Sequence, residues 1–235
     1  MDDLDERIET LAGWIAAVKY LVMFTGAGIS TESGIHDFRG PDGLWTRQEK
    51  GLPPPPKVDW SRVQPNQAHY AITTLQNMGK LKFLITQNVD NLHLKSGIKP
   101  ELIAEFHGNI TKLKCTSCEN QIDAFTDLIY TDCPICEQGK LVSSIVNFGD
   151  SIPRKAYEDS VRHSKQCDLF IVAGSSLTVY PATEMPEIAL KAGAKLVIIN
   201  GEKTLFDNRC HLRFWEKTGT VLSLMISKLD KLIDT

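Results

Sequence analysis

The 235-residue sequence has no long hydrophobic run and no excess of positive charge. No apolar stretch approaches the roughly 20 residues that a membrane-spanning helix needs. The formal net charge is −3, so the composition gives no indication of a nucleic-acid-binding surface. The acidic start, Met1–Glu6, lacks the basic and apolar regions of a signal peptide. We therefore expect a cytoplasmic protein that binds neither membranes nor nucleic acid directly.

The sequence also lacks internal repeats and any serine or cysteine nucleophile beside an obvious base. The chemistry of this chain would therefore be carried by a bound cofactor. Hydrophobic residues make up 42% and charged residues 23% of the chain, which is typical of a folded domain. The length suits one large domain that carries a small module.

Apolar runs of strand length alternate with amphipathic helical patterns along the chain. Strands are expected at residues 20–24, 82–86, 141–146, 168–173 and 195–200. Helices are expected at residues 3–19, 68–79, 154–166, 183–192 and 222–232. This alternation predicts an α/β fold with a doubly wound parallel (Rossmann-type) sheet. Residues 41–66 are too proline-rich for regular structure, which predicts a loop that is either a bland linker or a lid over a site.

The segment 24–40 joins the end of a strand to glycines and polar side chains. Gly26 and Gly28 would let the backbone approach a pyrophosphate, and a following helix would point its free N–H groups at the same anion. An ordinary tight turn between a strand and a helix has the same pair of glycines. The acid, aromatic and cation at residues 37–39 favour a loop that lines a site.

Polar side chains also follow the strand expected at residues 82–86. Gln87, Asn88 and Asp90 come within four residues of its end. The carboxyl ends of parallel strands are where an open α/β sheet places its ligand crevice. A capped turn would explain Asn88 or Asp90 taken alone, and a structural role would explain His107, which follows a later apolar run.

Four of the six cysteines form two Cys-x-x-Cys pairs separated by fourteen residues. Four thiolates can close a tetrahedron around Zn²⁺ with Zn–S distances of about 2.3 Å, which leaves no position for water or substrate. A redox disulfide is the alternative, but one pair would suffice for that. The pattern therefore predicts a structural zinc site, with the ligands Cys115, Cys118, Cys133 and Cys136.

Several segments together resemble the sirtuins, the NAD-dependent protein deacylases. The similar segments are Gly26–Ser30, Ser33–Gly40, Thr86–His93, His107–Asn109, the four cysteines, Gly174–Leu177 and Val197–Asn200. They occur in the order in which the family has them and cover most of the chain. The short stretch 41–66 and its Trp45 look most like the sirtuin-six branch.

This resemblance implies a division of the chain and two bound species. Residues 1–106 and 141–235 would form the NAD-binding Rossmann-type domain, with the loop 41–66 over its cleft. Residues 107–140 would form the zinc-binding module. NAD would be a co-substrate and zinc a structural ion. The partners would be acylated-lysine proteins or peptides, and we expect a monomer.

The resemblance also implies roles for individual residues. His107 would be the general base on the ribose hydroxyls, Asn88 would hold the ribose, and Asp90 would bind the nicotinamide carboxamide. The full set of NAD-binding residues would be Gly26, Ala27, Gly28, Ser30, Asp37, Phe38, Arg39, Trp45, Gln87, Asn88, Asp90, Gly174, Ser175, Ser176, Asn200, Gly201 and Thr218. The peptide would bind to Val146, Asn147, Phe148, Gly149, Val179 and Tyr180.

The chain departs from the family pattern at three places. His36 stands where proline is usual, and Asn147 replaces an apolar residue of the peptide-binding segment. Glu216 and Lys217 stand where a glycine-aromatic step often approaches the adenine. The expected function is NAD-dependent protein-lysine deacylation that yields nicotinamide and 2′-O-acyl-ADP-ribose. The alternatives are protein mono-ADP-ribosylation or NAD hydrolysis, and a non-catalytic binding module, which would lack His107 or the Asn-Val-Asp segment.

Overall fold

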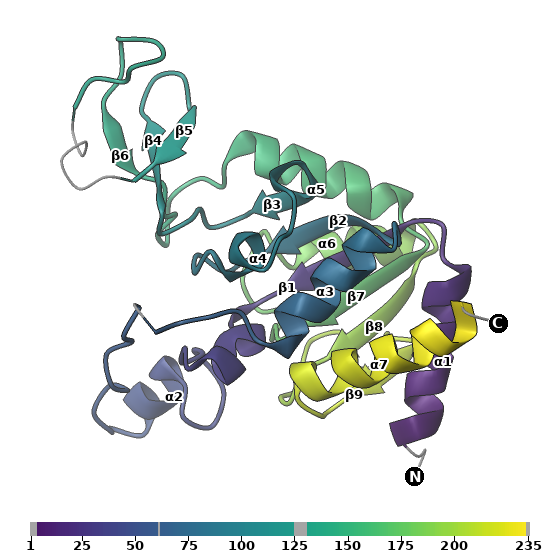
Figure 1. Cartoon of the computed structure of the whole chain (residues 1–235). Helices are drawn as coiled ribbons and strands as arrows, with labels where there is room; N and C mark the ends of the chain where they lie inside the picture. Colours follow the sequence, from purple (N-terminus) through teal and green to yellow (C-terminus); the bar gives the residue numbers. More distant parts are fainter. Residues whose placement is uncertain (1–3, 61, 125–130, 234–235) are drawn as a thin grey trace.

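The computed structural model describes residues 4–60, 62–124 and 131–233. Its main element is a six-stranded sheet with the order β3-β2-β1-β7-β8-β9 (Figure 1), in which every pair is parallel. The strands are β1 (Leu21–Thr25), β2 (Leu81–Thr86), β3 (Ile103–Glu105), β7 (Leu169–Ala173), β8 (Lys195–Ile199) and β9 (Leu212–Phe214). The chain runs outward from β1 to β3 and then crosses back to β7. The predicted doubly wound sheet is confirmed, and such sheets bind ligands where the strand order reverses.

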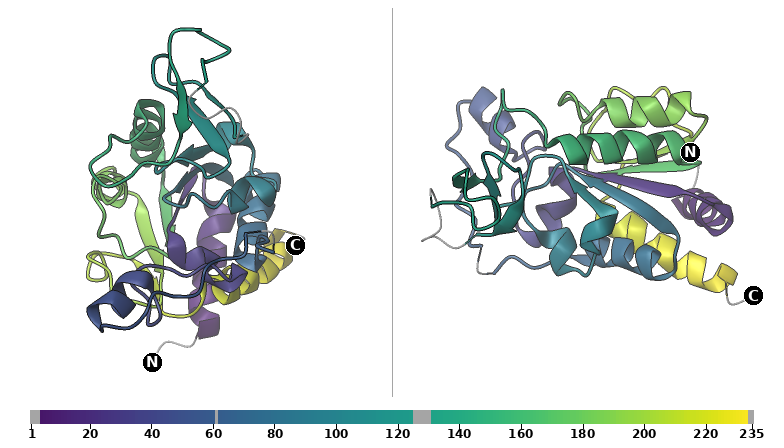
Figure 2. Two further views of the ribbon diagram at one scale, coloured as in Figure 1. Left: turned by 90° about the vertical axis from the view of Figure 1, so that its left-hand side faces the viewer. Right: turned by 90° about the horizontal axis from the view of Figure 1, so that it is seen from above.

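Helices cover both faces of the sheet (Figure 2). Side chains alternate along β1, so that Leu21 and Met23 pack on one face while Val22 and Phe24 pack on the other. The first face is covered by α1 (Leu4–Ala17), α3 (Gln67–Asn77) and α7 (Thr218–Ile233), and the second by α5 (Arg154–Gln166) and α6 (Glu184–Lys191). These five helices coincide with the five that the apolar periodicity predicts. Among the described helices, none is long and apolar enough to cross a membrane.

The loop prediction for residues 41–66 is wrong at α2 (Leu44–Glu49). These six residues contain no proline, and the first-turn N–H groups of α2 are satisfied by the preceding loop. Leu44 N donates to the carbonyl of Asp37 at 3.0 Å, and Trp45 N donates to that of Phe38 at 2.8 Å. Such contacts between neighbouring loops leave no periodic signal in a sequence.

Other short elements also differ from the sequence-based prediction. The helix expected after the glycine turn is the 3-10 helix η1 (Ala27–Ser33). The elements that the sequence analysis does not predict include α4 (Leu92–Lys95), η2 (Pro100–Leu102), β3 and β9. Each spans only three or four residues, too few for a periodic pattern to appear.

A second, three-stranded antiparallel sheet projects from the main domain (Figure 1). Its strands are β4 (Lys112–Cys115), β5 (Gln121–Asp123) and β6 (Leu141–Ser143), in the order β5-β4-β6. Residues 141–146 are expected to form a strand of the main domain, but β6 pairs with β4 instead. An apolar run predicts a strand without revealing its partner, so the small module includes β6.

The loops that follow β1 and β7 meet through their glycines. Gly28 N donates to the carbonyl of Gly174 at 2.8 Å, and Gly26 N donates to that of Ala173 at 3.1 Å. A Cβ atom on Gly28 would lie 2.8 Å from the Cα of Gly174, which itself has a φ of +68°. The glycines are therefore needed for the close approach of two backbone segments at the sheet's point of reversal.

Two glycine-to-alanine variants should change stability in opposite directions. Gly28→Ala forces its new methyl group against the Gly174 backbone, so we expect a loss of about 1–3 kcal/mol in the free energy of unfolding. Gly13 lies within α1, and a methyl group added there would meet no other segment within 4 Å, so Gly13→Ala should gain about 0.5–1 kcal/mol. Urea denaturation of both variants measures the difference, and equal stabilities would contradict the packing role of Gly28.

Candidate active site and metal centre

A cavity of about 530 Å³ lies beyond the carboxyl ends of β1, β7 and β8. It is where a doubly wound sheet places its ligand. Six of the residues predicted to bind NAD line it: Gly28, Asp37, Gly174, Asn200, Gly201 and Thr218. Segments from both halves of the chain thus converge on one cavity.

The cavity lining also contains residues that the sequence analysis does not assign to the site. They include three of the positions that depart from the family pattern, His36, Glu216 and Lys217, and also Glu32, Glu202 and Trp215. Glu216 forms an ion pair with Arg7 of α1 at 2.8 Å, and Glu32 accepts a hydrogen bond from Gly219 N at the start of α7 at 2.9 Å. No sequence pattern links Glu32 to a helix that begins almost two hundred residues later.

A second group of predicted residues forms a buried polar cluster after β1 and β2. Ser30 Oγ donates to Asp90 Oδ2 at 2.6 Å, and Asn88 Nδ2 donates to Ser30 Oγ at 3.1 Å. The other carboxylate oxygen of Asp90 accepts from Leu92 N at 2.9 Å. All three side chains are buried, and their mutual bonds satisfy the polar groups that burial would otherwise penalise.

The side chain of His107 contacts the backbone of Gln87, the residue that precedes Asn88 of this cluster. Its Nδ1 is 2.9 Å from the carbonyl oxygen of Gln87. A carbonyl only accepts hydrogen bonds, so Nδ1 carries the proton and Nε2 keeps its lone pair. Burial lowers the pKa of His107, although the bond to Gln87 opposes this shift. The ring is therefore held as a neutral base at neutral pH.

Two predicted residues in the loop after β7, Ser175 and Ser176, form side-chain hydrogen bonds. Ser175 Oγ donates to Gln87 Oε1 at 2.7 Å, which joins the loop after β7 to the loop after β2. Ser176 Oγ instead bonds to Thr178 Oγ1 at 3.1 Å.

Aromatic side chains from three different segments contact one another. The ring of Trp45 on α2 lies 4.9 Å from that of Phe38 and 5.9 Å from that of Phe148, measured between ring centroids. The Arg39 guanidinium lies 4.2 Å from the centroid of Trp45. Phe148 and Tyr180 are 81% and 74% exposed, so large apolar surfaces face solvent next to the site.

The predicted peptide-binding segments lie close to His107. Val146 N donates to the carbonyl of His107 at 2.9 Å. Asn147 donates from its backbone and side chain to Asp150 at 2.9 and 3.2 Å, so this residue closes a turn in place of an apolar contact. Gly149 has a φ of +93°. Val179 and Tyr180 lie in the segment between β7 and α6.

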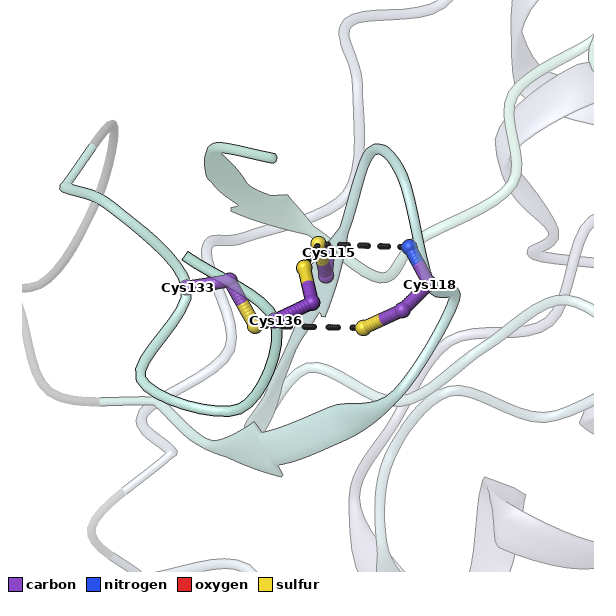
Figure 3. Close-up of side chains that lie close together, drawn as sticks. All are labelled: Cys115, Cys118, Cys133 and Cys136. Atoms are coloured by element: carbon purple, nitrogen blue, oxygen red, sulfur yellow. Dashed lines mark hydrogen bonds between the residues drawn. The ribbon is translucent and has the colours of Figure 1, made fainter. Parts of the chain in front are cut away.

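The four cysteines predicted to bind zinc gather in the small module (Figure 3). Their sulfur atoms all lie within 4.8 Å of one another, with Sγ–Sγ distances of 3.6 Å between Cys115 and Cys136 and 3.9 Å between Cys118 and Cys133. About 3.8 Å separates two sulfurs of a Zn²⁺ tetrahedron with 2.3 Å bonds. The donor set therefore fits a structural zinc ion and leaves no open position for catalysis.

Backbone and side-chain N–H groups already point at these sulfurs. Ser117 N donates to Cys115 Sγ at 3.3 Å, and Ile135 N donates to Cys133 Sγ at 3.4 Å. Hydrogen bonds from the backbone and side chain of Asn120 lower the pKa of Cys118 to about 6. Zinc binds the thiolate form, so the module favours the protonation state that the metal requires.

The α/β fold, the cavity and the buried polar cluster are typical of a dinucleotide-binding protein, here with an inserted module that has a four-cysteine cluster. Comparison with known proteins identifies its family. The Sir2 family model matches residues 26–58 and 56–181, and the chain belongs to the Sir2 family. NAD-dependent protein deacylase 2 of Archaeoglobus fulgidus is 37% identical to it over 251 residues, which cover 97% of this chain and 98% of that protein.

Two solved Sir2 structures are similar over almost the whole chain. One contains a deacetylated p53 peptide and 3′-O-acetyl-ADP-ribose, with 30% identity, a TM-score of 0.77 and coverage of 94% of this chain and 98% of that one. The other contains a myristoylated histone peptide, with 34% identity, a TM-score of 0.73 and coverage of 97% and 98%. Drosophila melanogaster Sirt6 is 33% identical to this chain, whereas the Archaeoglobus fulgidus protein is 37% identical. Sequence identity therefore does not single out the sirtuin-six branch, and assignment to that branch stays a prediction.

Replacing one zinc ligand should unfold the small module. The described buried cluster of this module is only Leu113, Cys115, Cys133 and Leu141, which is too little apolar surface to hold a fold without a metal. We expect Cys133→Ser to lose bound zinc and to become protease-sensitive. Cys210→Ser, a matched control outside the cluster, should retain one zinc per chain by metal analysis. A soluble Cys133→Ser variant with full zinc content would contradict the assignment.

Proposed function

We propose that this protein is an NAD-dependent protein-lysine deacylase that releases nicotinamide and 2′-O-acyl-ADP-ribose. The observation that carries the proposal is the neutral His107, which keeps Nε2 free beside the buried cluster of Asn88, Ser30 and Asp90. A free basic nitrogen next to amide and carboxylate groups suits proton removal from a ribose hydroxyl. Membership of the Sir2 family supports the same activity.

The cavity and the cluster suggest how NAD would be held. NAD supplies an anomeric carbon from which nicotinamide leaves, with the acyl oxygen of lysine as the attacking group. The adenosine end would occupy the cavity near Asn200, Gly201 and Thr218, and the pyrophosphate would lie against η1. Asn88 would hold the nicotinamide ribose and Asp90 the carboxamide. Tight positioning of the reacting groups lowers the barrier for such a weak, neutral nucleophile.

His107 would then move one proton. Its Nε2 would take the proton from a ribose hydroxyl, so that the 2′-oxygen can bond to the acyl carbon while the lysine nitrogen is released. The Gln87 carbonyl would stabilise the imidazolium that forms, because it accepts the Nδ1 hydrogen throughout. Residues 146–149 and 179–180 would hold the acylated peptide between them as an added strand, in which backbone bonds give affinity with little sequence preference.

The proposal extends to partner and compartment. Relatives of known structure carry p53 and myristoylated histone peptides, which supports acylated-lysine proteins as the partners of this chain. We infer a cytoplasmic location, because a reducing compartment keeps the cysteine thiols free for metal. We also infer that the chain acts as a monomer without nucleic acid.

The pH dependence of turnover should reflect His107. Since burial lowers its pKa below 6.5, the neutral base persists at pH 6.5, and the acid limb of kcat/KM should lie below that pH. A rate profile from pH 5 to 8 tests this expectation.

Removal of the imidazole should abolish most of the activity. His107→Ala should lower kcat at least about 100-fold while thermal midpoint and zinc content stay unchanged. Retained turnover in the alanine variant would refute the role of His107 as base.

The preferred acyl chain is a finer prediction. The exposed rings of Phe148 and Tyr180 offer apolar surface beside the site, and each buried methylene contributes about 0.8 kcal/mol. We therefore expect removal of a myristoyl group to be at least as efficient as deacetylation. Phe148→Ala should raise the KM for a myristoyl peptide more than that for an acetyl peptide, whereas Leu224→Ala on α7 should change neither. A much higher steady-state kcat/KM for the acetyl peptide than for the myristoyl peptide would contradict this expectation.

Mass spectrometry of acetyl-lysine and myristoyl-lysine peptides with and without NAD tests the function itself. Acyl-ADP-ribose should appear only with NAD, together with free lysine. Nicotinamide released while both peptides stay acylated would instead indicate ADP-ribose transfer or NAD hydrolysis.

A further inference from the structure

A chain of buried hydrogen bonds runs behind the catalytic cluster. Thr25 and Thr86 end the paired strands β1 and β2 and lie opposite each other in register. Thr25 Oγ1 donates to Thr86 Oγ1 at 2.9 Å, and Thr86 Oγ1 also accepts from Asn88 N at 3.1 Å. Both threonines are buried. The hydroxyl pair therefore fixes the backbone of the residue proposed to hold the ribose.

The chain continues to a buried histidine of α4. His93 Nε2 lies 2.9 Å from Thr25 Oγ1. Because the Thr25 hydroxyl hydrogen is used toward Thr86, Thr25 must accept at this contact, and His93 must carry its proton on Nε2. The Nδ1 of His93 is then an acceptor. It is buried and has no hydrogen-bond partner within the described part of the chain.

A second buried histidine packs against His93. His69 Nδ1 lies 3.0 Å from Asn66 Oδ1 and 3.3 Å from Asn66 N at the start of α3, and its Nε2 has no partner among the described residues. The two rings lie 4.9 Å apart between centroids. Burial lowers the pKa of His69 to about 4, against the opposing effect of Asp90, and that of His93 well below its ordinary value. Both rings are therefore neutral, and each has one buried nitrogen without a hydrogen-bond partner among the described residues.

We propose that His93 is a positioning residue that acts on Asn88 through Thr25 and Thr86. His93 contacts the Thr25 hydroxyl, the Thr25–Thr86 hydroxyl pair anchors Asn88 N, and the Asn88 amide reaches Ser30 Oγ, which donates to Asp90. None of the histidines or threonines in this relay needs to touch a substrate. The inference rests on the proposed function of Asn88 and adds residues that the cluster itself does not contain.

Paired variants separate positioning from simple packing. His93→Gln keeps a donor nitrogen at the same number of bonds from Cα, whereas His93→Leu fills the space without a donor. In the same way Thr25→Ser keeps the hydroxyl and Thr25→Val removes it. We expect the Leu and Val variants to lose about tenfold in kcat, equivalent to one lost hydrogen bond, with KM for the peptide little changed. The Gln and Ser variants should recover most of that loss.

A core truncation provides the control. Ile72→Val on α3 removes buried apolar volume from the core packed against the same sheet and should leave kcat unchanged at full zinc content. If His93→Leu and His93→Gln have the same kcat as the unchanged protein, or fall equally, the positioning role is overturned.

An NMR measurement keeps the inference separate from the proposed activity. The backbone amide of Asn88 should exchange with solvent faster in Thr86→Val than in Thr86→Ser, because only the latter keeps its acceptor. This readout needs no turnover. An inactive unchanged protein would overturn the proposed function, while equal exchange in the two variants would overturn the relay.

Discussion

The close approach of Gly28 and Gly174 is the contact on which the rest of the site depends. It joins the loops after β1 and β7 at the point where the strand order reverses, with 2.8 Å between the Gly28 nitrogen and the Gly174 oxygen. Because neither residue has a side chain, the two backbones can lie against each other and leave their remaining edges to the cavity. Moving either loop outward would displace η1, and with it Ser30 and the cluster that Ser30 joins. A backbone contact thus sets the geometry of side chains that lie some distance away.

Behind that contact, the site is a polar network in a low-dielectric surrounding. Asn88, Ser30 and Asp90 are buried, and each bonds to another member or to the backbone. Such networks are rigid when every group is satisfied and costly when one is not. His107 uses the same principle differently, because its fixed bond to Gln87 leaves a single nitrogen for chemistry. In the proposed function, the rigid cluster would hold the nicotinamide ribose and His107 would act as the base.

The small module has too small an apolar core to be stable by burial alone. Its described buried cluster consists of four residues, two of them cysteines, so a bound metal ion would supply the stability that apolar burial cannot. Four cysteine ligands would fill the coordination of a zinc ion, which would then take no part in the chemistry. The module instead positions the segment that follows it. Residues 146–149 come shortly after β6, and Val146 N donates a hydrogen bond to the carbonyl of His107.

The sequence by itself determined the doubly wound sheet, its five long helices and the four cysteines that gather in one cluster, because periodicity and cysteine spacing are local properties. It also identified His107, Asn88 and Asp90 as candidates through family resemblance. Only the tertiary structure decided the helix α2, the pairing of β6, the cavity lining by Glu32 and Trp215, and the link from His93 to Asn88. These features depend on contacts between residues far apart in the chain, where hydrogen-bond partners and burial are set by folding and leave no pattern along the sequence.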